Sequence, residues 1–70
     1  MRISVMRIGT RLGKLLDRSD FRMWLAQRDG LTDTSYGAVF SRVADHYAQE
    51  PGAAGRCTKL IANWENRHAR

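Results

Sequence analysis

The chain contains one cysteine and two histidines, the residue types that most often carry nucleophilic or metal chemistry. Cys57 has only His46 and His68 as possible partners, and His68 lies about 16 Å away along a predicted helix, at about 1.5 Å per residue. A zinc site needs several ligands at short spacings, and neither a CxxC nor an HxxxH motif is present. We therefore predict a protein that is not an enzyme, with no metal site and no cofactor, in which Cys57 is a small core residue.

The basic residues point instead to a polyanionic partner. Lys and Arg number 12 against 7 Asp and Glu, which gives a net charge of +5. The excess lies at the two ends, because residues 1–14 carry +4, residues 15–50 carry −2 and residues 51–70 carry +3. Such an excess attracts nucleic acid or an acidic protein face, and a solvated surface is the alternative interpretation.

Length and composition predict a single small domain over residues 1–70. One cysteine excludes an intramolecular disulfide, so the expected compartment is the reducing cytoplasm. No apolar run approaches the roughly 18 residues that span a bilayer, and the first residues lack the features of a secretory signal. We therefore expect a cytoplasmic protein with no membrane partner.

Hydrophobic periodicity predicts an all-α fold of about four helices. The spacing of Val5, Ile8, Leu12 and Leu15 predicts a first helix, although residues 1–9 could instead be flexible or extended. Ser19 is the predicted N-cap of a second helix over about residues 20–28, with Trp24 in the core. Gly30 then stands where a left-handed C-cap belongs.

Thr32 is the predicted N-cap of the third helix, and Leu31 with Tyr36 has the pattern of a hydrophobic staple. A buried stripe is predicted to follow from Tyr36 to Tyr47 through Phe40 and Val43.

Proline and glycine mark residues 50–55 as a loop, and the last helix is expected from about Arg56 to His68. One side of this helix is apolar and includes Trp64, which is either a core residue or an exposed anchor for a partner. Beside it runs a basic stripe formed by Arg56, Lys59, Asn63, Arg67 and Arg70.

Three stretches, residues 25–28, 30–32 and 35–40, resemble the first helix, turn and recognition helix of phage repressor and Cro proteins. In that helix-turn-helix family the recognition helix enters the major groove of duplex DNA and its early residues contact bases. The resemblance implies that Arg28 and Arg42 reach phosphates. It implies that bases are contacted by Thr32, Asp33, Thr34, Ser35, Gly37, Ala38 and Ser41.

The chain departs from the family at points that bear on function. Asp29 stands where the family usually has an apolar residue, and the implied reading face has no Arg, Lys, Asn or Gln for base pairing contacts. A helix-turn-helix fold whose DNA contacts are lost, or moved to the basic termini, therefore fits the residues equally well.

Two classes of function follow. The first is a transcription regulator of phage or mobile-element type that binds duplex DNA through the helix-turn-helix. The second is a protein-binding regulator, similar in size and charge to small phage-encoded factors that bind host RNA polymerase or a defence nuclease. The sequence does not decide between these partners.

Overall fold

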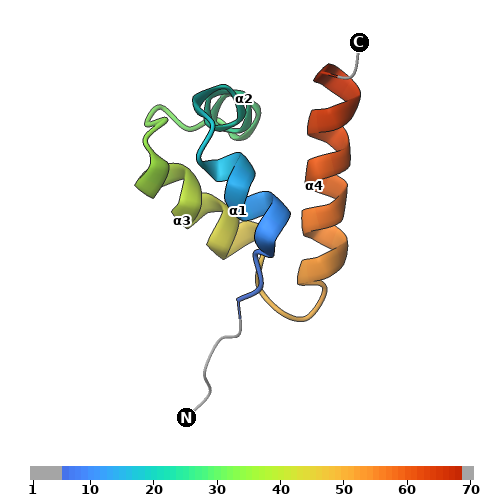
Figure 1. The fold of residues 1–70 in the computed structure, drawn as a ribbon. Helices are drawn as coiled ribbons and strands as arrows, with labels where there is room; N and C mark the ends of the chain where they lie inside the picture. The colour runs from blue at the N-terminus through green and yellow to red at the C-terminus, as the bar shows by residue number, and fades with distance from the viewer. Residues whose placement is uncertain (1–5, 69–70) are drawn as a thin grey trace.

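A computed structural model gives the structure of residues 6–68. The chain folds into helices α1 (Thr10–Leu16), α2 (Ser19–Asp29), α3 (Tyr36–His46) and α4 (Ala53–His68). Helices α1, α2 and α3 pack across one another, and the longer α4 lies along one side of this group (Figure 1). The predicted all-α fold of about four helices is confirmed. None of the helices within residues 6–68 is long and apolar enough to cross a membrane.

The core is built by all of these helices together. At its centre the rings of Phe21 and Trp64 meet edge to face with 5.3 Å between centroids, and the Trp24 ring lies 5.4 Å from that of Trp64. Trp64 is 5% exposed, so it is a core residue, and its interpretation as an exposed anchor is wrong. Such aromatic pairs add about 0.5–1.5 kcal/mol to the free energy of burial. The most deeply buried side chains are Leu12, Leu16, Phe21, Leu25, Val39, Val43 and Leu60.

The segment before α1 is extended over residues 6–9, so the extended alternative is confirmed there and the prediction of a helix over these residues is wrong. Met6 forms an antiparallel bridge with Gln49, and the Arg7 N–H donates to the Ala48 carbonyl at 2.8 Å. Gly9 then adopts φ 81°, a left-handed value outside the helical region, immediately before α1. The bridge is a contact distant in sequence, which periodicity could not reveal. Val5 lies outside the described residues.

Helix α2 begins near the predicted position with a different cap. Its N-cap is Arg18 and not Ser19, and no side chain caps it there. Asp20 Oδ1 accepts from the Phe21 N–H at 2.8 Å and also pairs with the Arg18 guanidinium. At the other end Gly30 has φ 74° and ψ 27°, so the predicted left-handed C-cap is confirmed.

Helix α3 begins later than predicted, because a local turn takes the place of its expected first residues. Asp33 Oδ1 accepts from the Ser35 N–H at 2.9 Å, and Ser35 Oγ accepts from the Ala38 N–H at 3.3 Å. Ser35, not Thr32, is therefore the N-cap. Aspartate side chains compete with helix formation in this way. Arg22 fixes the turn to the end of α1, since its guanidinium donates to the Leu16 and Thr34 carbonyls.

The face that α3 buries differs from the predicted one. Tyr36 is the first residue of the helix and is 45% exposed, stacked on Phe40 with 5.8 Å between centroids. The predicted staple with Leu31 and the buried position of Tyr36 are both wrong. Val39, Val43 and Ala44 are the buried residues of α3.

Helix α4 begins at Ala53, so the predicted loop over residues 50–55 is too long at its C-terminal end. The Arg56 N–H already donates to the Gly52 carbonyl at 3.1 Å. Alanine is the best helix former, so the alanines at positions 53 and 54 allow the helix to begin before Gly55 and to include it. On the apolar side of α4, Cys57 and Trp64 are both buried, as predicted.

Candidate nucleic-acid interface

One flank of α4 carries polar side chains at intervals of three and four residues, and most of them are basic. Arg56, Lys59 and Arg67 are exposed there and Asn63 is half-buried, whereas Arg70 lies outside the described residues. Arg28 reaches the same flank from the end of α2, because it shares a hollow of about 110 Å³ with Lys59 and Asn63. We call Arg28, Arg56, Lys59, Asn63 and Arg67 the basic face.

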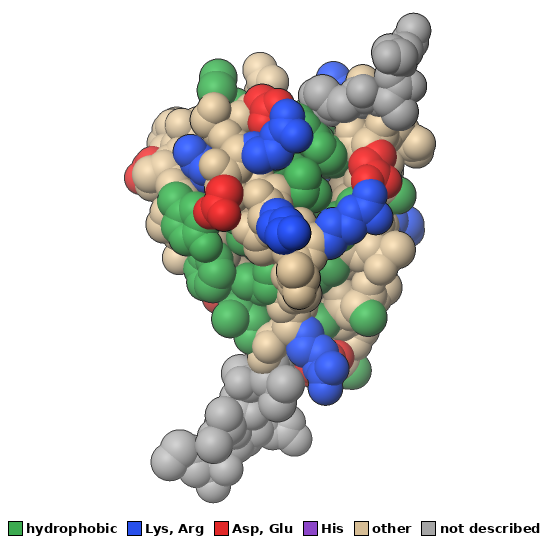
Figure 2. Space-filling model, in the orientation of Figure 1, with side chains coloured by type: hydrophobic (Ala, Val, Ile, Leu, Met, Phe, Trp, Pro, Cys, Tyr) green, Lys and Arg blue, Asp and Glu red, His purple; other side chains and the backbone are tan. Residues whose placement is uncertain are grey.

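The cations of the basic face differ from those elsewhere in their pairing. Arg7 pairs with Glu50 at 2.9 Å, Arg11 pairs with Glu65, and Arg18 pairs with Asp20. Figure 2 shows basic side chains beside acidic ones on the side of the molecule that α1 forms with α4. These pairs cancel much of the charge on that side.

The cations that α4 contributes to the basic face keep their positive charge. Arg56 donates from Nε to the Tyr47 carbonyl at 3.1 Å and from Nη2 to the Gln49 carbonyl. Neutral carbonyls fix the guanidinium without cancelling its charge. Lys59 and Arg67 are exposed, and neither forms an ion pair with a described residue. Arg28 does approach a carboxylate, because its Nε lies 3.9 Å from Asp29 Oδ1, but the side chain of Asp29 is only 9% exposed and also pairs with Arg42 at 3.1 Å.

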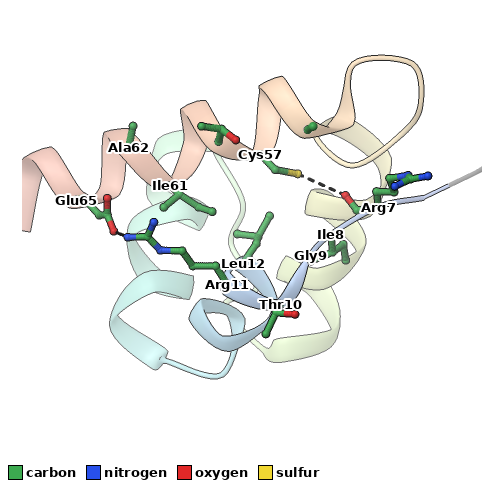
Figure 3. A pocket seen from close by; sticks show the side chains of 12 residues that line it. Arg7, Ile8, Gly9, Thr10, Arg11, Leu12, Cys57, Ile61, Ala62 and Glu65 are labelled. Carbon is green, nitrogen blue, oxygen red and sulfur yellow. Dashed lines mark hydrogen bonds and ion pairs between the residues drawn. The ribbon is translucent and has the colours of Figure 1, made fainter.

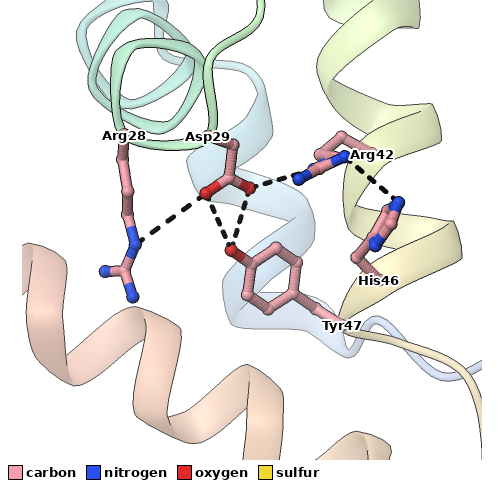
Figure 4. A network of polar contacts seen from close by, with 5 residues as sticks. All are labelled: Arg28, Asp29, Arg42, His46 and Tyr47. Carbon is pink, nitrogen blue, oxygen red and sulfur yellow. Dashed lines mark hydrogen bonds and ion pairs between the residues drawn. The ribbon is translucent and has the colours of Figure 1, made fainter.

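Asp29 is the centre of a polar network that joins α2 to the end of α3 (Figure 4). The Tyr47 hydroxyl donates to Asp29 Oδ2 at 2.9 Å, and Arg42 Nε donates to the same oxygen at 3.1 Å. Arg28 Nε lies 3.9 Å from Asp29 Oδ1, and Arg42 also donates to the His46 ring at 3.1 Å. Burial, followed by the contact with Asp29, raises the pKa of Tyr47 above its usual value.

Sequence reasoning noted Asp29 only as a departure from a family pattern and missed this network. The signal that could have revealed it is the combination of a carboxylate at an expected buried position with basic residues at 28 and 42. A buried carboxylate requires such partners, because an isolated buried charge is costly.

The residues expected to read bases lie elsewhere. Figure 1 places the connection between α2 and α3 at the edge of the molecule opposite α4. Gly37 and Ser41 are exposed on α3 and Ala38 is half-buried. The other four residues expected to contact bases lie in the connection before α3 and not in a recognition helix, so that expectation is wrong for Thr32, Asp33, Thr34 and Ser35.

The charge of this edge does not favour a phosphate backbone. The Ser35 N–H, the largest influence, lowers the pKa of Asp33, which therefore remains an exposed carboxylate at neutral pH. Arg42, which was expected to reach a phosphate, instead directs its guanidinium to Asp29 and His46. Of the two predicted phosphate contacts, only Arg28 belongs to the basic face.

The other flank of α4 forms an apolar groove of about 440 Å³ with the segment before α1 (Figure 3). Ile8, Leu12 and Ile61 line it, and the pair of Arg11 and Glu65 closes one side. Cys57 at its floor is 5% exposed, and its thiol donates to the Arg7 carbonyl at 3.7 Å. Burial raises the pKa of this thiol, which disfavours the thiolate needed for nucleophilic chemistry.

Nowhere in residues 6–68 do three or more His, Cys, Asp or Glu side chains gather in a way that could hold a metal ion. Comparison of the chain with protein-family models, with curated proteins and with solved structures found no match.

Proposed function

We propose that this chain is a small, non-enzymatic regulator of transcription that binds duplex DNA through the basic face and acts in the cytoplasm. The observation that supports the proposal is that the two flanks of α4 differ in ion pairing. On one flank Arg56, Lys59 and Arg67 form no ion pair with a carboxylate of residues 6–68, whereas on the other flank Arg11 is neutralised by Glu65. Cations held in this way release counterions from DNA when they contact its phosphates.

The proposal retains the helix-turn-helix resemblance in a modified form. Helices α2 and α3 supply the scaffold, and α4 with the end of α2 supplies the phosphate contacts. The lack of basic side chains between residues 32 and 41 supports this division. Such a protein would bind DNA with little sequence preference, because phosphate contacts position a protein and base contacts specify a sequence. We propose that the protein is a regulator of phage or mobile-element type.

Fluorescence anisotropy with a labelled duplex, measured over a series of salt concentrations, tests the proposal. If Arg28, Arg56, Lys59 and Arg67 each contact a phosphate, the logarithm of affinity should fall against the logarithm of salt with a slope of about −3.6. Absence of binding at low salt would contradict the proposal.

A charge-matched pair of variants separates the basic face from net charge. Lys59→Glu on α4 and Lys14→Glu on α1 change the net charge equally, and both residues are exposed. We expect Lys59→Glu to weaken binding and to reduce the slope by about 0.9, whereas Lys14→Glu has the smaller effect. Equal effects would mean that net charge alone attracts the DNA.

Exposed apolar side chains favour one second function, that of a protein-binding regulator. Tyr36 is 45% exposed on Phe40 and Met23 is 60% exposed, and hydrophobic side chains gather over α3 in Figure 2. Aromatic residues and methionine are enriched at protein interfaces. Under this alternative the partner is a bacterial protein such as RNA polymerase. A polymerase subunit retained on the immobilised protein after nuclease treatment, and lost with Tyr36→Ser, would support it.

A further inference from the structure

A shallow groove between α2 and α4 lies at one end of the basic face. Its volume is about 330 Å³, and it is lined by Trp24, Gln27, Arg28 and Arg67. The lining therefore combines an aromatic ring, two guanidinium groups and an amide, and none of the described residues that line it is a carboxylate. Phosphate binding alone needs only the cations. The aromatic ring and the amide are the additional features that require an explanation.

The ring of Trp24 is held in a fixed orientation. Its centroid lies 5.7 Å from that of Phe21 and 5.4 Å from that of Trp64, and both of these residues are buried. On its open side the guanidinium carbon of Arg28 lies 5.5 Å from the ring centroid, within cation–π range. Trp24 and Arg28 thus form a layered platform, with the guanidinium lying over the ring.

A platform of this kind is suited to a nucleobase. Bases stack on aromatic rings and on arginine planes, and each stacked base contributes about 1–3 kcal/mol. Within a duplex both faces of a base are covered by its neighbours, so only an unpaired nucleotide can stack on a side chain. Arg67, on the opposite wall of the groove, supplies a second cation for the phosphate attached to such a nucleotide.

We propose that the groove binds one unpaired nucleotide where single-stranded DNA adjoins a duplex, with the base on the platform of Trp24 and Arg28 and the phosphate between Arg28 and Arg67. This inference rests on the proposed function, because the basic face holds the adjoining duplex. Gln27 is exposed beside the platform and offers a hydrogen bond donor and an acceptor to the edge of the base.

The test compares a blunt duplex with the same duplex carrying a short thymidine overhang, by anisotropy at one salt concentration. We expect the overhang to raise affinity about tenfold, the equivalent of stacking one base. A 2-aminopurine placed as the first unpaired base should lose fluorescence on binding. Trp24→Leu and Arg67→Gln should each reduce the ratio of the two affinities toward one, whereas Tyr36→Leu, which removes an exposed aromatic ring outside the groove, should not.

Circular dichroism must first show that Trp24→Leu folds. If Trp24→Leu does not fold, Arg67→Gln alone provides the test, because Arg67 is exposed. Equal affinities for the blunt and overhanging duplexes would overturn the inference and leave the proposed function standing. A preference for the overhang that survives both groove variants would place the nucleotide elsewhere and also overturn it. Absence of binding to either duplex would overturn the inference together with the proposed function.

Discussion

Asp29 connects the end of α2 to the end of α3, and its carboxylate is nearly buried, with 9% of the side chain exposed. The Tyr47 hydroxyl and the Arg42 guanidinium both donate to it. A hydrogen bond to a charged group contributes about 1.5–3 kcal/mol, and loss of either donor leaves the carboxylate less well compensated. The network therefore stabilises the fold at the position where the basic face begins.

We expect Tyr47→Phe to lower the free energy of unfolding by about 1.5 kcal/mol at neutral pH, the lower end of that range because Tyr47 is only half-buried. The variant should also change the response to alkaline pH. Because the pKa of Tyr47 is raised in the folded protein, its stabilising effect is complete below about pH 10, the unfolded value, and is lost as pH rises through the folded pKa.

Urea unfolding between pH 7 and 11 measures this effect. Stability of the wild type should fall more steeply above about pH 10 than that of Tyr47→Phe. The pKa of the Cys57 thiol is also raised, but this group is present in both proteins and its contribution cancels in the difference. Tyr36→Phe, at the exposed tyrosine, should follow the wild type, and parallel curves for wild type and Tyr47→Phe would contradict the expectation.

At the scale of elements, the two ends of the connection between α2 and α3 are fixed in different ways. Gly30 ends α2 with φ 74°, and the Leu31 N–H closes the cap on the Ala26 carbonyl at 2.8 Å. Ser35 and Asp33 then set the start of α3 through hydrogen bonds of their own. The length of the connection follows from these local contacts.

A pair of glycine substitutions tests the backbone argument. A Cβ would have open space at both Gly30 and Gly13, so steric contact does not distinguish the two positions and their backbone conformations do. Gly30→Ala should cost about 1 kcal/mol because of its left-handed φ. Gly13→Ala, inside α1, should stabilise the protein by about 0.8 kcal/mol. Thermal unfolding of the two variants measures both effects, and a shift of the same sign in both would refute the assignment.

The elements predicted correctly from sequence are those determined by nearby residues. The Gly30 cap depends on the residue type, and the buried side of α4 follows from a spacing of three and four residues around Cys57 and Trp64. The basic stripe on the neighbouring flank follows from the same spacing.

The features that could not be predicted depend on contacts distant in the sequence or on competition between local structures. The extended segment at Met6 is fixed by Gln49, and the network at Asp29 is completed by Tyr47. The predicted start of α3 is misplaced because Thr32 and Ser35 are both good capping residues, and the hydrogen bond that Asp33 accepts from the Ser35 N–H favours the second. The groove at Trp24 was not predicted, because its walls come from separate helices.

At the scale of the whole molecule, the two flanks of α4, on either side of its buried stripe, differ in whether their charges are paired. One flank packs beside the N-terminal segment, where carboxylates pair with arginines, and the other flank faces outward as the basic face. A domain of this size buries only about 60% of the surface of its unfolded chain, so each helix depends on the others for its stability. We therefore expect the helices to unfold as one unit.

Cys57 reports on that cooperativity, because its thiol lies 3.7 Å from the carbonyls of both Arg7 and Tyr47, where α4 meets the rest of the chain. Buried as it is, at 5% exposed, the thiol should react with a thiol reagent only when the domain opens. Trp64→Leu weakens α4 itself, and Val39→Ala weakens α3. If the domain opens as one unit, both variants should accelerate labelling by about tenfold for each ~1.4 kcal/mol that urea unfolding shows them to lose. If Trp64→Leu accelerates labelling and a comparably destabilised Val39→Ala does not, α4 detaches alone. The basic face would then be a surface that can separate from the helices beside it.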